Sequence, residues 1–493
     1  MPEEFVQVQE PTQFSKSRLW EIQNTLYETL GLRAWQYFNV PLYVTNHPIL
    51  AKHYAELVAA YLEGIELERK EPIYILELGV GSGRFSYLFL HYFCSIFRKH
   101  PFVYVLVDHV RKNLEDIETH PLLKSYFDLG CLDLSLMNPL KEETFTLWKS
   151  GMVLSRKSVS NPLVVLANYF FDTIEQDLFT LKDQRLFQTL VKLSLPQSVY
   201  EKKYKEGKVD WIDALKLEYS YSPFIGSAFI QEYSKQMKKD CFFYVPTGAF
   251  RVWDLLKGIA DDFFLLSGDQ GFSTLEQVQE NRKMEIARHT SFSVSVNYHC
   301  FADYVKALGG KNYSSFFARE QFMVNLAVCG RQPLHLERAF TRTISHFDMH
   351  DYWKFTHCLE ELVPYPPLSL LFYLLKLGEW DPVLFFAHRE EILKSLASLK
   401  GEVKRDWLEA ITLSYKVFFP IAKEEAPVYV CYGQCFQQLF SFDLAIECFE
   451  LALEVDPACA SALLHLGLCR MQMGEPEEAL LWMEKGKVNS SVQ

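Results

Sequence analysis

The fold is decided by one short stretch, Ile73-Tyr-Ile-Leu-Glu-Leu-Gly-Val-Gly-Ser-Gly83. Its first six residues form an apolar run of strand length, and three glycines at alternate positions follow. From Arg84 onward, large apolar side chains recur every three to four residues, as on one face of an amphipathic helix. A strand, a glycine turn and a helix in this order predict the first βα unit of a parallel sheet.

Further apolar runs of strand length occur at Phe102–Val107, Leu163–Ala167 and Phe263–Leu266. A helical pattern covers His47–Glu63, upstream of the first strand. Strands that are apolar throughout are typical of a sheet that is buried on both faces. We therefore predict an α/β fold with a doubly wound, Rossmann-like sheet, followed by an all-α region.

Two changes in the sequence pattern divide the chain. Mixed charge between about residues 181 and 250 interrupts the βα rhythm and predicts an inserted segment. Strand signals fade after Gly330-Arg-Gln-Pro333. We expect a sheet domain over residues 1–330, degenerate helical repeats over 331–425 and a repeat domain over 426–493.

The repeat domain holds two copies of a 34-residue pattern. In a frame that starts at Ala426, small and large apolar residues occupy the positions Tyr429, Tyr432, Gly433, Phe436, Ala445, Phe449, Ala452 and Pro457. The second copy, from Ala460, departs late, with Gly486 where a small Ala is usual. This spacing is similar to the tetratricopeptide repeat, whose helix pairs stack on neighbouring repeats. We expect the repeats to bind a substrate protein or a partner protein.

Composition bounds the class of protein. The 493 residues are 49% hydrophobic, which excludes a disordered chain, and 50 Lys+Arg against 62 Asp+Glu give a net charge of −12. An acidic chain without a long basic run is poorly suited to bind nucleic acid or an anionic membrane. The eleven cysteines are scattered, with no C-x-x-C pair, and the apolar stretches are too short to cross a bilayer. We expect a cytoplasmic protein with reduced thiols.

The glycine turn carries the chemistry. A dinucleotide-binding fingerprint places its third glycine where this chain has Arg84. The form E-x-G-x-G-x-G instead resembles the turn of S-adenosylmethionine-dependent methyltransferases. This resemblance implies a cofactor site made of Glu77, Gly79, Gly81, Ser82 and Gly83, with Asp108 on the ribose hydroxyls and Asp133 on the adenine amine. The open alternative is a glycine turn that only packs a helix on a strand, with Asp108 and Asp133 as local caps.

An ordered set of motifs narrows the resemblance. Asn168-Tyr-Phe-Phe-Asp172, Gly268-Asp269-Gln-Gly271 and Ser293-Val-Ser-Val-Asn297 resemble the N-E-x-x-D, D-Y-G and T-x-V-x-F elements of MidA-type methyltransferases, which include the mitochondrial complex I assembly methyltransferase. Tyr43-Val-Thr45-Asn46 resembles the entry segment of that family. The resemblance spans about residues 40–330. It implies S-adenosylmethionine as cofactor, with Thr45 among its ligands, and methylation of a protein side chain, by analogy arginine.

The same resemblance implies the acceptor-side residues. Asn168 and Asp172 follow a parallel strand at the end where ligands bind, and the amide oxygen of Asn168 is available to a donor nitrogen. The alternative is that they cap a helix. Tyr169 replaces the family Glu and Gln270 replaces the family Tyr. These departures keep open an inactive scaffold that acts through its repeats, while a dinucleotide or nucleotide-sugar enzyme is disfavoured by Arg84.

Two other clusters have simpler interpretations. His346, His350 and His357 invite a metal site, but the segment lacks H-E-x-x-H and we interpret it as a polar helix face with no metal. Cys431 and Cys435 fall at repeat positions that pack between helices, so we expect core thiols.

Overall fold

The computed structural model describes residues 4–36, 43–208, 211–280, 284, 286–289, 291–315, 322–421 and 425–490. Contacts divide the chain into two units. The first consists of Met1–Thr45 and His53–Phe347, and the second of Asn46–Lys52 and Asp348–Gln493. The candidate site lies in the first unit, so the two units are described separately.

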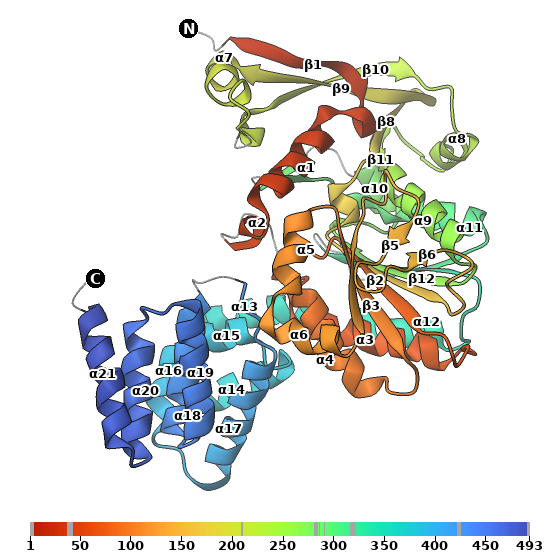
Figure 1. Cartoon of the computed structure of the whole chain (residues 1–493). Helices are drawn as coiled ribbons and strands as arrows, with labels where there is room; N and C mark the ends of the chain where they lie inside the picture. The colour runs from red at the N-terminus through yellow and green to blue at the C-terminus, as the bar shows by residue number, and fades with distance from the viewer. Residues whose placement is uncertain are drawn as a thin grey trace. The chain divides into compact units, whose positions relative to one another are not determined.

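The first unit is built around a seven-stranded sheet (Figure 1). Its spatial order is β4 (Leu132–Leu136), β3 (Phe102–Asp108), β2 (Ile73–Leu78), β7 (Leu163–Asn168), β12 (Phe263–Asp269), β18 (Met323–Cys329) and β17 (Lys311–Ser314). The first five strands are parallel, and β18 runs antiparallel to both neighbours. The strand order reverses between β2 and β7, which is the place where doubly wound sheets bind ligands.

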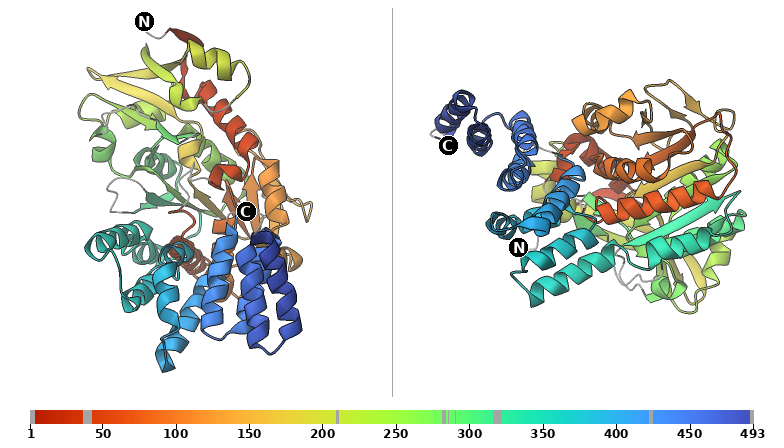
Figure 2. Two further views of the ribbon diagram at one scale, coloured as in Figure 1. Left: turned by 90° about the vertical axis from the view of Figure 1, so that its left-hand side faces the viewer. Right: turned by 90° about the horizontal axis from the view of Figure 1, so that it is seen from below.

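Helices cover both faces of this sheet (Figure 2). Phe264 packs against Tyr61 of α3 (Pro48–Glu63), while its neighbour Phe263 packs against Trp253 of α9 (Thr247–Ile259). Consecutive strand residues point to opposite faces, so α3 and α9 lie on opposite sides. The other helices that connect or flank these strands are α4 (Arg84–Ile96), α5 (Arg111–Glu118), α6 (Pro121–Asp128), α11 (Tyr298–Ala307) and α12 (Leu336–Phe340). The predicted α/β fold class is confirmed.

A second sheet forms where the βα rhythm is interrupted. Strands β8 (Asp177–Lys182), β9 (Arg185–Pro196), β10 (Lys216–Pro223) and β11 (Cys241–Val245) pair antiparallel. They are joined by β1 (Phe5–Gln13), which pairs with β9, and α1 (Arg18–Leu30) packs beside them. We call these five strands and α1 the roof.

The sequence did not reveal that the N-terminal segment belongs to the roof. Apolar side chains from β1, α1 and the inserted strands share one core, which includes Phe14, Trp20, Leu193 and Tyr244. Residues 291–297 form two short strands, β15 (Ser291–Ser293) and β16 (Val296–Asn297). They pair with different partners, β14 (Ala287–His289) and β13 (Gly271–Phe272).

The second unit is helical. Its helices are α13 (Met349–Leu362), α14 (Leu368–Leu377), α15 (Pro382–Ala387), α16 (Arg389–Leu396), α17 (Gly401–Lys416), α18 (Ala426–Gln438), α19 (Phe442–Val455), α20 (Ala460–Gln472) and α21 (Pro476–Ser490). In the first repeat copy, a Cβ at Gly433 would lie 2.5 Å from the Phe449 ring, so only glycine lets α18 and α19 approach this closely. Cys431 and Cys435 are buried, as predicted.

The segment that carries His346, His350 and His357 includes a helix cap formed by two aspartates. Asp348 accepts from the backbone N–H of Asp351, and Asp351 accepts from the N–H of Asp348, which together form a capping box at the start of α13. Within the described ranges, no group of three or more His, Cys, Asp or Glu side chains is placed to hold a metal ion.

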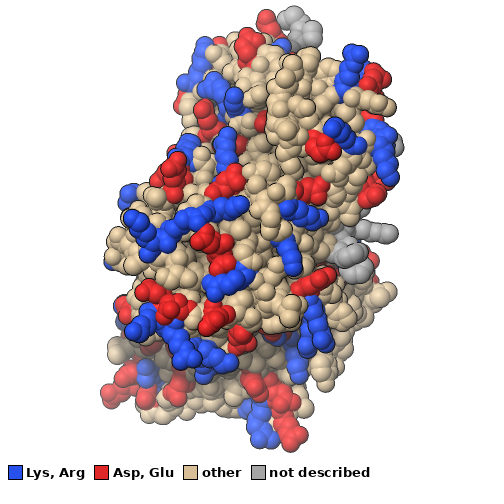
Figure 3. Space-filling model, turned by 90° about the vertical axis from the view of Figure 1, so that its right-hand side faces the viewer, with Lys and Arg blue, Asp and Glu red and all other residues tan. Residues whose placement is uncertain are grey.

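Charged side chains of both signs are interspersed over the face of the molecule in Figure 3. This face carries no continuous basic surface of the kind that grips a phosphate backbone. No helix in the described part of the chain has the length and apolarity needed to span a membrane.

Candidate cofactor and acceptor site

The glycine turn between β2 and α4 has the backbone that its sequence requires. Gly79, Gly81 and Gly83 have φ values of 71°, 57° and 78°, a region that side chains with a Cβ rarely adopt. A Cβ at residue 79 would lie 3.0 Å from the Phe170 ring, and one at residue 83 would lie 3.2 Å from Ile117. The turn therefore needs glycine both for its conformation and for close packing, and Ser82 is buried within it.

Glu77 lies beneath the turn. Its Oε2 accepts hydrogen bonds from Ser86 Oγ at 2.5 Å and from Tyr104 Oη at 2.8 Å. Burial raises the pKa of Glu77 to about 7, although these two hydrogen bonds oppose the rise. The carboxyl group thus ties β2 to α4 and β3, and the structure gives it a supporting role under the turn.

Asp108 ends β3 beside the turn, as the sequence suggested. Its carboxylate accepts from the N–H groups of Gly81 at 3.3 Å and Val110 at 2.8 Å, and from the Asn113 amide at 3.4 Å. Burial raises its pKa, opposed by His109 and these donors. Two buried polar atoms in its immediate surroundings, Asn113 Oδ1 and His109 Nε2, have no hydrogen-bond partner. Such unpaired atoms suit the hydroxyl and amine groups of a nucleoside.

Asp133 is placed differently. It lies inside β4, and its two oxygens accept from the backbone N–H groups of Leu134, Lys149 and Ser150 and from Ser150 Oγ, at 2.7–3.1 Å. This carboxylate caps the turn at residues 149–150, which leaves it little capacity for an adenine amine. Thr45 is buried in the segment that precedes α3.

Asn168 ends β7 on the face covered by α3. Its Oδ1 accepts from the Tyr54 hydroxyl at 2.9 Å, while its buried Nδ2 has no partner. Tyr54 uses one of the two lone pairs of this oxygen, so the expectation that the oxygen accepts from a donor nitrogen stays a prediction. The unpaired N–H of the amide is a second group that Asn168 offers. A Cβ at Gly268 would lie 2.7 Å from Tyr54 Oη and 2.9 Å from Asn168 Oδ1, so this contact also requires glycine.

The turn after β7 is strained. Tyr169 has a φ of 46°, unusual for a residue other than glycine, and its N–H donates to Gly268 O at 2.8 Å. Strain of this kind persists where the surroundings fix it, and it clusters at functional sites. The next residue, Phe170, packs on Gly79, so this turn and the glycine turn are in contact.

Asp172 and Asp269 bring two carboxyl groups together at the ends of β7 and β12. The N–H of Asp172 donates to Asp269 Oδ1 at 3.2 Å, and Asp269 Oδ2 accepts from Tyr298 Oη at 2.5 Å. Both acids are buried, and Asp172 Oδ1 has no partner. Burial raises the pKa of both groups, and the charge of Asp269 adds to the rise at Asp172.

The roof reaches this edge of the sheet through α1. Gln23 donates to Thr173 O at 3.0 Å and accepts from the N–H of Phe292 at 3.0 Å. Burial raises the pKa of Tyr27 to about 12, and the charges of Asp172 and Asp108 add to the rise. Tyr27 therefore interacts electrostatically with both Asp108, on the cofactor side, and Asp172, on the acceptor side.

Sequence reasoning brought together the glycine turn, Asp108, Asn168 and Asp172, and all of them line one edge of the sheet. It assigned no site role to Tyr27, Tyr54, Asp269 or Tyr298. The one signal in the sequence was for Asp269, which lies shortly after the apolar run Phe263–Leu266 in the stretch that resembles the D-Y-G element. The tyrosines arrive from distant helices, and no local pattern marks them.

The chain was compared with family models, curated proteins and solved structures. The tetratricopeptide repeat model matches residues 426–459, which is the first predicted repeat copy. No curated protein matches the chain. Two solved structures from Burkholderia thailandensis are each 11% identical with a TM-score of 0.40, and the alignments cover 64% and 66% of this chain and 93% and 96% of theirs. One is an uncharacterised protein, and the other is a likely methyl transferase bound to S-adenosyl-homocysteine.

A third structure is the plantazolicin methyltransferase in complex with S-adenosyl-homocysteine. It is 9% identical, with a TM-score of 0.28 over 64% of this chain and 100% of that one. These likenesses are distant, and the chemistry of those proteins does not transfer to this chain through them.

Proposed function

We propose that the chain is an S-adenosylmethionine-dependent methyltransferase that acts on a protein side chain and recruits its substrate or partner through the C-terminal repeats. The observation that carries the proposal is the pairing of a left-handed glycine turn with Asp108 at the ends of β2 and β3. The glycine turn lets the methionine part of the cofactor come close to the backbone N–H groups at the N-terminus of α4, which favour its carboxylate. The carboxylate of Asp108 can accept hydrogen bonds from the ribose hydroxyls.

The cofactor residues in this proposal are Gly79, Gly81, Ser82, Gly83 and Asp108, with Thr45 at the entry to α3. Asn113 and His109 supply the unpaired polar atoms for the nucleoside. Glu77 supports the turn from beneath. Asp133 leaves the set because its oxygens are already used.

On the acceptor side, the chain's task is to orient the acceptor and to take its proton. S-adenosylmethionine supplies an activated methyl group when bound. Asn168 offers an N–H donor that holds the acceptor, since Tyr54 fixes its amide. Asp172 offers an unpaired carboxyl oxygen. Positioning of this kind contributes much of the rate in a displacement reaction, and a nitrogen or oxygen acceptor also needs a base. Arginine is the acceptor by analogy alone.

The first experiment is a calorimetric titration of the full chain with S-adenosylhomocysteine, with NAD as control ligand. We expect binding in the micromolar range for the thioether and none for NAD. Asp108→Asn should weaken the binding by tenfold or more, because a neutral amide pairs less well with two hydroxyls. Asp133→Asn is the matched control, and its binding should stay near that of the unaltered chain. Binding of NAD instead, or of neither ligand, would overturn the cofactor assignment.

A second candidate function is a scaffold that keeps the fold but transfers no methyl group. The observation in its favour is Tyr169, which replaces an acidic residue of the family element and holds a strained backbone. Incorporation of labelled methyl groups from S-adenosylmethionine into cell extract distinguishes the two. Transfer that requires Asp172 supports the enzyme. Cofactor binding without any transfer supports the scaffold.

A further inference from the structure

Asp172 and Asp269 differ in the hydrogen bonds that their carboxyl groups accept. Asp269 ends β12 with no exposed surface, and its carboxylate accepts hydrogen bonds from two donors, the N–H of Asp172 at 3.2 Å and the Tyr298 hydroxyl at 2.5 Å. Asp172 has one carboxyl oxygen that is buried without any partner. A carboxylate with donors remains charged far more readily than one without them.

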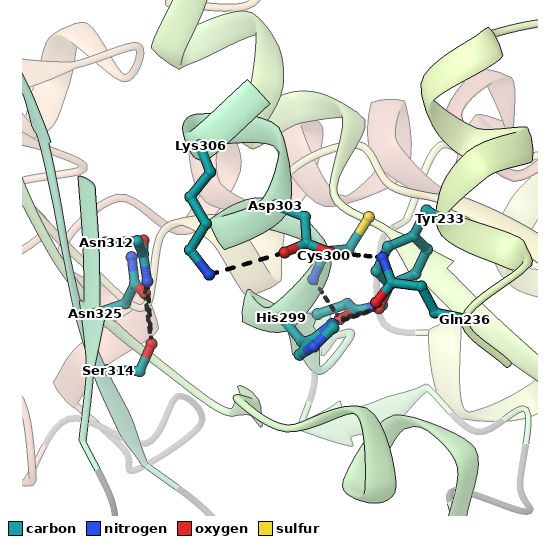
Figure 4. Close-up of polar contacts among 10 residues, drawn as sticks. Tyr233, Gln236, His299, Cys300, Asp303, Lys306, Asn312, Ser314 and Asn325 are labelled. Carbon is teal, nitrogen blue, oxygen red and sulfur yellow. Dashed lines mark hydrogen bonds and ion pairs between the residues drawn. The ribbon is translucent and has the colours of Figure 1, made fainter. Parts of the chain in front are cut away.

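Tyr298 is held rigidly for this contact. It is the first residue of α11, and the preceding residue, Asn297, caps that helix by accepting from the N–H of Cys300 at 2.9 Å. The amide of Asn297 donates to Tyr244 O at 2.9 Å and to the Tyr233 hydroxyl at 3.2 Å. Figure 4 shows how Tyr233 also meets His299, so α8 (Ala228–Ser234) and α11 are joined next to this cap.

The two carboxyl groups are close enough to influence each other's ionisation. The charge of Asp269 raises the pKa of Asp172 beyond the effect of burial, and the hydrogen bond from Tyr298 opposes the rise at Asp269. The charges of the pair also raise the pKa values of three tyrosines on other segments: Asp172 acts on Tyr27, Asp269 acts on Tyr54, and both act on Tyr169. Two buried carboxyl groups that interact in this way share protons. Their apparent pKa values therefore describe the pair and not either residue alone.

We propose that Asp172 and Asp269 form a carboxyl dyad that holds one proton near neutral pH, and that this singly charged dyad takes the proton lost by the methyl acceptor. Tyr298 is a positioning residue that keeps Asp269 ionised. The proposal rests on the proposed function for its reaction, but the shared proton is a property of the chain alone.

A lone pair of the acceptor's N–H or O–H group forms a bond to the methyl carbon, and the bond between that carbon and sulfur breaks with its electron pair left on sulfur. The proton of the acceptor passes to the dyad, which becomes neutral, and S-adenosylhomocysteine leaves. The proton then returns to water before the next cycle. No oxidant or further reactant is needed.

Difference infrared spectroscopy tests the dyad without any acceptor. A buried protonated carboxyl group gives a C=O band separate from those of carboxylates and amides. We expect one such band at neutral pH that Asp172→Asn removes. In Asp269→Asn the band of Asp172 should titrate at a pH lower by roughly one unit or more, because the like charge is gone. Glu77→Gln is the control, since Glu77 has its own raised pKa and its band must be told apart.

Tyr298→Phe serves as the second variant, because it removes one oxygen atom and leaves the packing. Without its donor, Asp269 should keep a proton to higher pH, so its band should titrate at a pH raised by about half a unit or more. Titrations that are unchanged in both Asp269→Asn and Tyr298→Phe would overturn the dyad. Calorimetry with S-adenosylhomocysteine should give the same affinity, within about threefold, in all these acceptor-side variants. A chain that binds no cofactor but keeps the shifted bands would therefore refute the proposed function and leave the dyad standing.

Discussion

Two neighbouring turns form the candidate site, and they are built in opposite ways. The glycine turn after β2 is shaped by its backbone, and its carboxylate, Asp108, already accepts from the N–H groups of Gly81 and Val110, although Asn113 Oδ1 and His109 Nε2 nearby have no partner. The turn after β7 uses side chains, and it leaves Asn168 Nδ2 and Asp172 Oδ1 buried without partners.

This difference indicates a division of labour. A turn whose backbone is fixed by its glycines and by local hydrogen bonds keeps its shape with or without a ligand. This suits a cofactor that is replaced in every catalytic cycle. A turn with unpaired buried groups is costly until something pairs with them, so it favours the acceptor that does. The four changes below test this contrast, two on each turn.

The largest effect is expected from Gly79→Val. A side chain there requires a left-handed backbone and meets the Phe170 ring, so the turn must move and the affinity for S-adenosylhomocysteine should fall by more than about 100-fold. The matched control is Gly130→Val, at a similar φ of 70° but with no atom within 4 Å of its Cβ. Calorimetry on both proteins checks the prediction, and equal losses would mean that strain rather than the site is responsible.

Glu77→Gln should change how stability depends on pH. Glu77 keeps its proton to about pH 7 in the folded chain, against about 4.5 when exposed, so it makes the folded state lose stability as the pH rises through that interval. Glutamine cannot ionise, and the variant should gain up to roughly 3 kcal/mol relative to the unaltered chain between pH 4.5 and pH 8. Urea unfolding at several pH values measures this. Parallel stability curves would contradict the raised pKa.

Gly268→Ala tests the turn after β7, because Gly268 of β12 packs against Asn168 at the start of that turn. The added methyl group would push on Phe322, Tyr54 and Asn168. Overpacking of this kind costs about 1–3 kcal/mol of stability. We expect methyl incorporation to fall by at least tenfold while the affinity for S-adenosylhomocysteine changes less than threefold, the reverse of the result at Gly79. If Gly268→Ala lost as much cofactor affinity as Gly79→Val, the assignment of one turn to the cofactor and the other to the acceptor would be wrong.

Tyr54→Phe should give the smallest effect. It removes the hydroxyl that donates to Asn168, with a loss of about 1 kcal/mol of stability and a severalfold loss of methyl incorporation as the amide becomes free to rotate. Tyr61→Phe on the same helix is the control, since Tyr61 donates to Arg331 O at 3.2 Å and lies away from Asn168. Chemical denaturation and incorporation assays compare the pair, and equal incorporation by both would argue against a role for Tyr54.

The same contrast explains what could be predicted from the sequence. The glycine turn, the apolar strands and Asp108 at a strand end are local signals, and each was recognised in a stretch of fewer than about ten residues. The partners of the acceptor turn come from α3, β12 and α11, which lie far apart in the chain. Asn168 was identified, but its orientation depends on Tyr54, 114 residues away. The sequence could not indicate that the Asp133 carboxylate accepts from the N–H groups of Lys149 and Ser150, because those residues lie 16 and 17 positions further along the chain.

The roof has a consequence for how the chain is made. Gln9 of β1 donates to the backbone oxygen of Val191 in β9, 182 residues along the chain, so β1 leaves the ribosome well before its partner strand does. Until then its apolar neighbours, including Phe14 and Trp20, are exposed to water and to other chains. Contacts of such long range slow folding. We therefore expect the nascent N-terminal segment to depend on chaperones, and closure of the roof to be a late event in the maturation of the protein.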